Sequence, residues 1–247
     1  MSFQQKTLDL ARQRVGALCT GFDGYVSAFE AEGLFTGPSL YFHRKTLAIR
    51  RDLACSVEAC LKDDGFFESL YATLASWGLH RMGPGNTKLV DLSVMVCGFR
   101  RQAENLKNLE RVTIQGLSPE STWHAADLIC NVIWDLPVGI GSTKIVSGSK
   151  ALHHLLPDLV PPIDREYTVQ FFFNNKNAIQ GDEAKQREAF HLMYPHFVTV
   201  CRERKTEIEC RLGRGMNTSV TKVVDNAIVG YGRTVLKIRG ERTEEGE

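Results

Sequence analysis

The chain has 247 residues, of which 43% are hydrophobic and 24% are charged. This composition supplies enough apolar material for a buried core and excludes global disorder. The formal net charge is only +1, from 30 basic and 29 acidic side chains, so strong nonspecific attachment to nucleic acid is disfavoured, although a local basic face is not excluded.

The sequence carries no signal for secretion or for membrane insertion. The first ten residues, MSFQQKTLDL, lack an apolar signal-peptide core, and no apolar run approaches the roughly 18 residues of a membrane span. The odd number of cysteines, with no CxxC pair, favours reduced and mostly buried thiols. We therefore expect a cytoplasmic protein; the cysteines are Cys19, Cys55, Cys60, Cys97, Cys130, Cys201 and Cys210.

Helical periodicity dominates the first half of the chain. The first 60 residues predict two or three helices, and a second apolar face from Phe67 to Trp77 predicts another, with Gly78 as a place to end. Apolar residues at steps of three and four predict one helix over 87–109, with Asn86 as its N-cap.

The clearest helix start lies at Ser118, with Pro119 in the first turn and Glu120 against the helix dipole. This helix is expected to bury Trp123 and to end at Leu136-Pro137. The next helix is expected over 142–156, where the small Gly148 would let another helix approach closely.

The adjacent prolines Pro161 and Pro162 exclude a helix across the following turn, and a helix resumes near Arg165. Residues 174–177 predict a loop, and 182–212 predict a long charged helix with a kink at Pro195. For 220–231 the pattern fits a helix or a strand, and both alternatives stay open.

Strand-like alternation is scarce, so the predicted fold is all-α, a compact multi-helix domain. We expect one helical unit over residues 1–235, with a tail at 236–247. A division into two lobes would place about 1–60 and the C-terminal helices in one and about 61–175 in the other.

The most informative segment is the turn between the two central helices. Gly139 and Gly141 flank one apolar residue, and Ser142 or Thr143 can cap the helix that follows at once. Glycines let a backbone approach a phosphate closely, and the N–H groups at a helix start attract the anion. This pattern is typical of a helix-hairpin-helix, although a plain helix–helix corner would need the same glycines.

The next turn, Val160-Pro161-Pro162-Ile163-Asp164, extends the pattern. From Leu136 to Asp164 the chain resembles the helix-hairpin-helix DNA glycosylases, in which such a turn delivers a catalytic aspartate and bifunctional members carry a lysine after the hairpin. By position, Gly139 and Gly141 match the hairpin glycines, Asp164 matches the aspartate, and Lys144 lies near the lysine position, 164 − 144 = 20 residues earlier.

The resemblance implies base-excision chemistry on double-stranded DNA without a cofactor. Lys144 would attack the sugar as an amine, and Asp164 would orient it or stabilise a cationic sugar. The base would be flipped into a pocket, and DNA contacts would fall to Gly139, Gly141, Ser142, Thr143 and Lys150.

The chain departs from the family pattern at several points. Val138 is an extra hairpin residue that shifts the register of Lys144, and Arg165-Glu166 replaces the histidine expected two residues after the aspartate. No four-cysteine iron–sulfur loop is present. Lys150, 14 residues before Asp164, is therefore a rival for the lysine role. Asp164 also suits an N-cap for the helix at Arg165.

Other polar clusters have simpler interpretations. His153 and His154 would point about 100° apart on a helix, so we expect no metal site there. The basic run 202–214 interleaves with Glu203, Glu207 and Glu209, which predicts a salt-bridged surface.

Three functions remain in contention. The first is a DNA glycosylase-like hydrolase of DNA repair, with Asp164 and Lys144 in its site. The second is a noncatalytic helix-hairpin-helix module that binds DNA. The third is a helical scaffold for protein partners that the sequence does not identify.

Overall fold

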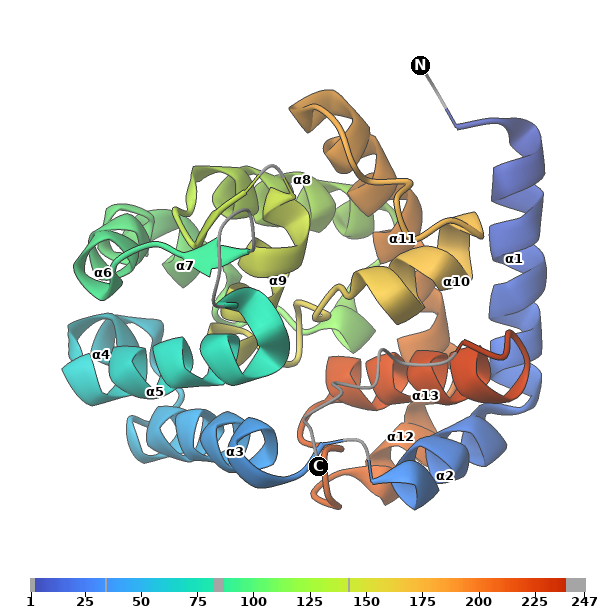
Figure 1. Cartoon of the computed structure of the whole chain (residues 1–247), viewed down its shortest axis with the longest axis horizontal. Helices are drawn as coiled ribbons and strands as arrows, with labels where there is room; N and C mark the ends of the chain where they lie inside the picture. Colours follow the sequence, from blue (N-terminus) through green and yellow to red (C-terminus); the bar gives the residue numbers. More distant parts are fainter. Residues whose placement is uncertain (1–2, 34, 82–86, 142, 239–247) are drawn as a thin grey trace.

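Thirteen α-helices form nearly all the regular structure in the part of the chain that the computed structural model describes, residues 3–33, 35–81, 87–141 and 143–238 (Figure 1). With 72% of the structure helical, the predicted all-α class is confirmed.

The helices are α1 (Gln5–Thr20), α2 (Phe22–Glu32), α3 (Gly37–Asp52), α4 (Val57–Lys62), α5 (Asp64–Leu74), α6 (Leu92–Arg101), α7 (Ala103–Leu109), α8 (Pro119–Asp135), α9 (Lys144–Leu155), α10 (Gln170–Phe173), α11 (Glu183–Glu203), α12 (Lys205–Arg211) and α13 (Val220–Thr234). The shorter elements are the π-helical turns η1 (Ala75–Leu79) and η3 (Arg165–Val169), the 3₁₀ turn η2 (Ile114–Gly116), and the strands β1 (Lys88–Leu89) and β2 (Gly139–Ile140).

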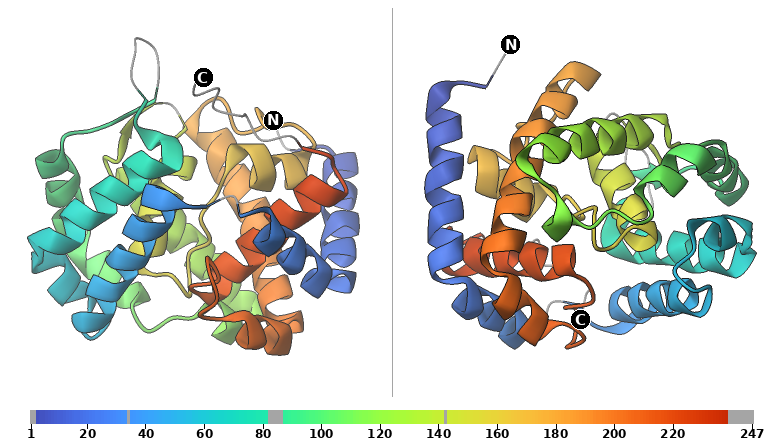
Figure 2. Two further views of the ribbon diagram at one scale, coloured as in Figure 1. Left: turned by 60° about the horizontal axis from the view of Figure 1, so that its bottom comes forward. Right: turned by 180° about the vertical axis from the view of Figure 1, so that it is seen from behind.

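The helices gather into two sides that share one continuous core (Figures 1 and 2). On one side α2 packs on α13, and α1 packs on α10 and α11; on the other, α3 packs on α5 and α9, and α4 packs on α5, α6 and α7. Helix α8 contacts both α9 and α11, which joins the two sides. The packing thus separates the sides after α2 rather than near residue 60. The tail expected from residue 236 is described only to residue 238.

The predicted start of α8 and its approach to α9 are both confirmed. The Ser118 hydroxyl accepts a hydrogen bond from Ser121 N–H at 3.1 Å, and the Ser121 hydroxyl accepts one from Ser118 N–H at 2.7 Å. A Cβ on Gly148 of α9 would lie 2.8 Å from the Ile133 side chain of α8. The expectation that Trp123 is buried is wrong, because this side chain faces outward with 54% of its surface exposed.

Residues 220–231 are helical, which settles the alternative left open by the sequence. Helix α13 is buried on every side from Val220 to Gly232. Its backbone meets α2 closely, since a Cβ on Gly230 would lie 1.9 Å from the carbonyl oxygen of Tyr25. An apolar run without a solvent-facing side fits a helix and a strand equally well, so the sequence pattern alone could not distinguish the two.

The single helix predicted over 87–109 is wrong. Leu89 pairs with Gly139 in an antiparallel ladder, and the Val90 N–H donates to the carbonyl of Val138 at 3.1 Å. Helix α6 therefore begins only at Leu92, and the chain breaks again at Gln102 before α7. Long-range hydrogen bonds override the helical periodicity, because Leu89 is buried just as well in a strand. The expected N-cap, Asn86, lies outside the described residues.

The charged stretch 182–212 is also divided. Asp182 caps α11 by accepting from Lys185 N–H at 2.9 Å, and Pro195 lies inside that helix. The interruption comes at Arg204, between α11 and α12.

Candidate functional site

A cavity of about 500 Å³ lies where α9, α13 and the turns η1 and η3 meet. Its wall includes Trp77 from η1, Lys150 from α9, Asp164 and Tyr167 from the start of η3, and Asp225 from α13. The volume is within the roughly 300–1,000 Å³ of small-molecule sites in proteins. Aromatic rings and ionisable groups thus converge here from segments far apart in the sequence.

Trp77 reaches the cavity because the chain bends sharply at η1. Gly78, with φ of +79°, adopts a left-handed conformation that other residues rarely tolerate. The predicted helix end at Gly78 therefore has a structural use, since the bend places an indole ring at the cavity wall.

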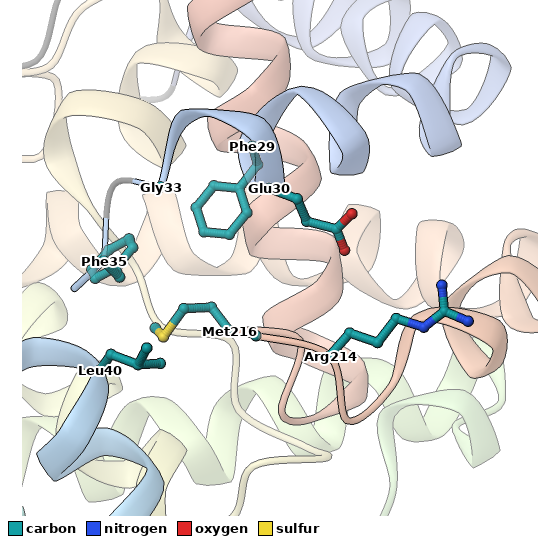
Figure 3. Close-up of a pocket in the computed structure, with 8 residues that line it drawn as sticks. Phe29, Glu30, Gly33, Phe35, Leu40, Arg214 and Met216 are labelled. Atoms are coloured by element: carbon teal, nitrogen blue, oxygen red, sulfur yellow. The ribbon is translucent and has the colours of Figure 1, made fainter.

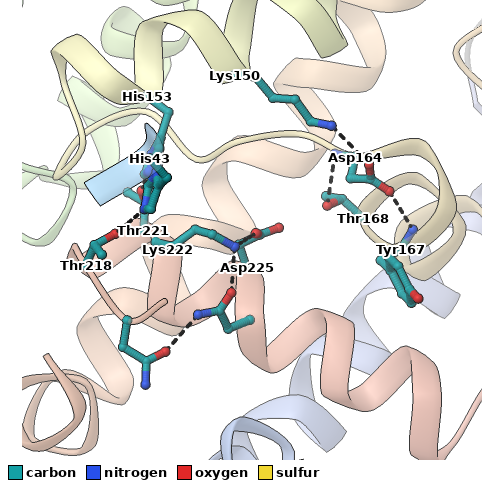
Figure 4. A network of polar contacts seen from close by, with 12 residues as sticks. His43, Lys150, His153, Asp164, Tyr167, Thr168, Thr218, Thr221, Lys222 and Asp225 are labelled. Carbon is teal, nitrogen blue, oxygen red and sulfur yellow. Dashed lines mark hydrogen bonds and ion pairs between the residues drawn. The ribbon is translucent and has the colours of Figure 1, made fainter. Parts of the chain in front are cut away.

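Asp164 has partners for both oxygens of its carboxyl group (Figure 4). Oδ1 accepts from the backbone N–H of Glu166 at 2.8 Å and of Tyr167 at 3.2 Å, which makes Asp164 the N-cap of η3. Oδ2 lies 3.2 Å from Nζ of Lys150. The two expected roles of Asp164, as a helix cap and as a partner of a lysine, therefore coexist in one side chain.

The Asp164 carboxyl is held in its ionised form. Burial would raise its pKa, but the Lys150 ammonium and the two capping N–H groups outweigh burial and hold the pKa below the ordinary value. The side chain is still 34% exposed, whereas that of Lys150 is 10% exposed. A carboxylate with some access to the cavity faces an almost covered lysine.

Lys144 does not reach Asp164. Its Nζ donates to the carbonyl of Trp134 at 2.8 Å and lies 5.0 Å from the centre of the Trp134 ring, at the end of α8. Each helical position turns the side chain by about 100°, so the register of the hairpin decides which lysine faces the cavity. The structure brings Lys150 to Asp164 instead.

The hairpin connects α8 to α9 through β2. A Cβ on Gly139 would come within 3.3 Å of the Lys88 carbonyl, so this glycine permits the close approach of β1. Gly141 faces open space, and Thr143, the residue before α9, makes no side-chain capping bond. Ser142 lies outside the described residues. The use of this hairpin for phosphate contact stays a prediction.

A second lysine–aspartate pair, which the sequence analysis missed, lies in the same cavity wall. Nζ of Lys222 is 2.7 Å from Oδ2 of Asp225 and 2.6 Å from Oδ1 of Asn226. The rings of Phe29, Phe35 and Trp77 surround the ammonium at 5.1–5.8 Å from their centres. The sequence does carry one signal for this pair. Lys222, Asp225 and Asn226 stand at helical positions i, i+3 and i+4, which places them on one face of a mostly apolar helix.

Three buried histidines pack behind Trp77. Nδ1 of His154 lies 2.8 Å from the Lys150 carbonyl and must donate to it, which leaves Nε2 to accept from Nδ1 of His43 at 2.9 Å. Nδ1 of His153 is 2.9 Å from the carbonyl of Val160. Burial lowers the pKa of all three rings, so they are neutral. Two of them, His43 and His154, pack against Trp77 in the cavity wall. No set of side chains suited to a metal ion occurs in the described residues.

A smaller cavity of about 290 Å³ lies on the other side of Phe35 (Figure 3). Phe29, Leu40 and Met216 form its apolar lining, and Figure 3 shows the Glu30 and Arg214 side chains directed away from these groups. Ionisable groups do not converge there, so we place the candidate site in the larger cavity.

The expected salt-bridged surface over 202–214 is confirmed. Arg204 pairs with Glu207 at 3.1 Å, and Lys205 pairs with Glu209 at 3.8 Å. Arg211 pairs instead with Asp23 and Glu30 of α2, at 3.1 and 2.9 Å.

Comparison of the chain with known protein families, curated proteins and solved structures gives no match. In the described ranges, no helix has both the length and the apolar character that a bilayer crossing needs.

Proposed function

We propose that the protein takes one nucleotide of a nucleic acid into the large cavity and hydrolyses its N-glycosidic bond, as a DNA glycosylase does. The observation that carries this proposal is the pair formed by Asp164 and Lys150 in the wall of the cavity, beside the rings of Trp77 and Tyr167. An ionised carboxylate next to an aromatic pocket is what a reaction through a cationic sugar requires.

Asp164 is the residue that would face the reacting sugar. As the C1′–N bond breaks, positive charge develops on the sugar, and a carboxylate fixed by three donors stabilises it without having to reorient. Lys150 positions this carboxylate. The reaction is hydrolysis rather than formation of a Schiff base, because Nζ of Lys150 is held by the Asp164 carboxylate at 3.2 Å and its side chain is only 10% exposed, whereas a nucleophile must reach C1′.

The remaining wall suits a nucleotide that has left the base stack. Trp77 and Tyr167 offer ring faces on which a base can stack. Arg165 in the same wall, which donates to the Lys176 carbonyl and to Asn177, adds positive charge that attracts phosphates, whereas Lys176 is paired with Glu166 at 2.9 Å. The open backbone at Gly141 lies at the start of the helix that carries Lys150, which gives a second place for backbone contact.

Asp164→Asn tests this proposal. We expect release of free base from duplexes with single damaged or undamaged bases to fall at least about 100-fold, since the variant lacks the charge that stabilises the transition state. Asparagine caps helices as well as aspartate, so the fold should persist. Lys144→Gln is the matched control and should keep full activity, because the Lys144 side chain is bound at Trp134 and Lys144 is not among the residues that line the cavity. Base release is measured by chromatography, with duplex binding measured at two salt concentrations.

Borohydride trapping in the same reactions separates the lysine roles. We expect no covalent adduct. An adduct that disappears in Lys150→Met would make Lys150 a nucleophile, and one that disappears in Lys144→Gln would restore the role expected from the sequence. Absence of base release together with absence of binding at both salt concentrations would overturn the proposed function.

A noncatalytic nucleic-acid-binding module is the second candidate. It is favoured by the complete set of hydrogen bonds at Asp164, which explains that residue as a cap of η3 without any reaction. This candidate predicts salt-dependent binding without base release, and binding that Asp164→Asn leaves unchanged.

A further inference from the structure

The large cavity has three carboxyl groups in the part of its wall that the structure describes. Glu166 is paired with Lys176 at 2.9 Å, and the other two come from different elements. Asp164 stands before η3, and Asp225 stands on α13. Figure 4 shows both side chains in one view, with the Asp225 carboxyl extending from α13 toward the side of the network where Asp164 and Tyr167 lie. A substrate that fills the cavity would therefore meet the carboxyl groups of both Asp164 and Asp225.

The two oxygens of Asp225 have different surroundings. Oδ2 accepts from Lys222 at 2.7 Å, whereas Oδ1 is buried and has no hydrogen-bond partner among the residues that the structure describes. A buried polar atom without a partner is rare and costly in a folded protein, so it calls for an explanation. A proton on Oδ1 and an acceptor on a bound molecule would provide one.

Lys222 is held so that it supports this arrangement. Its ammonium also donates to Asn226, whose own amide donates to Oδ1 of Asn217 at 2.7 Å, and three aromatic rings enclose it. The ammonium thus stays on the Oδ2 side of Asp225, a residue of the cavity wall, and leaves Oδ1 without a partner among the described residues. When Asp225 loses a proton, the same ammonium stabilises the carboxylate that remains.

We propose that Asp225 is the general acid of the cavity, and that Oδ1 delivers a proton to a nitrogen atom of the departing base. This inference rests on the proposed function, because it assigns the second group that the same cleavage needs. Asp164 serves the sugar, and Asp225 serves the leaving group.

The direction of the pKa shifts agrees with this division. Burial raises the pKa of Asp225 and outweighs the opposite effect of Lys222, while the pKa of Asp164 is lowered. The charged groups that face Asp225 are Lys222 on its own helix, Asp164 before η3, and Lys150 on α9. Two carboxyl groups whose environments separate their pKa values are a recurrent basis for acid and base roles.

Cleavage of the C1′–N bond in this way needs no reagent other than water. The C1′–N bond breaks and its electron pair goes to the base nitrogen, which takes the proton from Oδ1 of Asp225. The sugar is left as a cation beside the Asp164 carboxylate. Water adds its oxygen to C1′, and the proton that it releases returns to Asp225. The products are a free base and a sugar with a C1′ hydroxyl.

Asp225→Asn tests this assignment on two duplexes that differ only in methylation of the departing purine at N7. The methylated base is cationic and leaves without protonation, so the variant should lose about 100-fold in single-turnover rate on the neutral base and only a few-fold on the cationic one. Asp164→Asn should lose rate on both duplexes. Equal losses in Asp225→Asn on both would show a structural role and overturn the assignment.

The pH profile gives a second readout of the same variant. The wild-type rate should fall on the alkaline side as Asp225 loses its proton, and this limb should disappear in Asp225→Asn. A limb that persists would contradict the proposal.

The proton on Asp225 can be measured without any reaction. Infrared spectra at about pH 5.5, where an ordinary aspartate with a pKa of about 3.9 is ionised, should show a protonated carboxyl band that Asp225→Asn removes. Absence of this band would overturn the acid role. If the band is present and no duplex releases base, the proposed function fails and the general acid fails with it. If base release depends on Asp164 alone, only the role of Asp225 fails.

Discussion

The two lysine–aspartate pairs of the cavity have the same chemistry and opposite surroundings. Lys150 and Asp164 lie 3.2 Å apart with side chains 10% and 34% exposed, whereas Lys222 and Asp225 lie 2.7 Å apart with 2% and 8% exposed. Asp164 has three donors shared between its two oxygens, and Asp225 has one oxygen without any. The number of donors and the access of water, rather than the identity of the pair, decide how each carboxyl group holds its proton.

The two pairs are expected to differ most in how far the free energy of unfolding falls when the lysine is removed. Lys222→Met removes the donor to Oδ2 of Asp225 and to Oδ1 of Asn226 and leaves two buried acceptors unsatisfied, so the free energy of unfolding should fall by about 2–6 kcal/mol. Urea denaturation at neutral pH measures this change.

The double variant Lys222→Met, Asp225→Leu is the control for that loss. Replacing both partners of a buried hydrogen bond by apolar groups of similar shape can be nearly neutral, so the double variant should recover the part of the loss that comes from Asp225. If it stays as unstable as Lys222→Met, the loss comes from packing against the three rings and not from the unpaired carboxyl.

A smaller effect is expected at the other pair. Lys150→Met removes one partner of a carboxylate that keeps two backbone donors and contact with solvent, so the loss should be about 1–2 kcal/mol. The same urea series gives the value. A loss equal to that of Lys222→Met would mean that burial does not distinguish the two pairs.

The smallest effect is on the pH dependence of stability, and its sign differs between the pairs. The lowered pKa of Asp164 gives stability that is present above the unfolded value of about 3.9 and is lost as pH falls through the folded pKa. The raised pKa of Asp225 acts in the opposite sense, because the folded state holds its proton more tightly and stability declines as pH rises from about 4 through the folded pKa.

Unfolding midpoints of the two Asn variants, measured from pH 3 to pH 7, separate these contributions. Asp164→Asn should flatten the acid side of the curve, and Asp225→Asn should remove a decline above about pH 4 relative to wild type. Two curves of the same shape would contradict the opposite shifts.

The site could be predicted from the sequence only where a local signal marks it. Two adjacent prolines followed by an aspartate predict a turn and a cap, and the structure has both at Asp164. The choice between Lys144 and Lys150 could not be made, because it depends on how far the hairpin rotates α9. That rotation is set by β1, which pairs with β2 from 50 residues earlier in the chain.

The second pair had no local signal of comparable strength. Lys222 and Asp225 lie within a long apolar stretch, where charged residues would ordinarily mark a solvent face. The packing of α13 against α2, η3, α11 and α12, together with rings from Phe29, Phe35 and Trp77, makes them interior. Periodicity predicted α8 and α9 but failed over 87–109, where a strand pairing intervenes, and it did not give the surroundings of any helix.

The contact at Gly230 fixes one wall of the cavity in place. Because the backbones of α13 and α2 touch there, α13 cannot slide along α2 without a collision between main chains, and Asp225 lies only five residues away, about 7.5 Å along the axis. This wall is therefore expected to keep its position when a ligand binds. Adjustment to a ligand of another size has to come from other parts of the wall, such as the bend at Gly78 that carries Trp77.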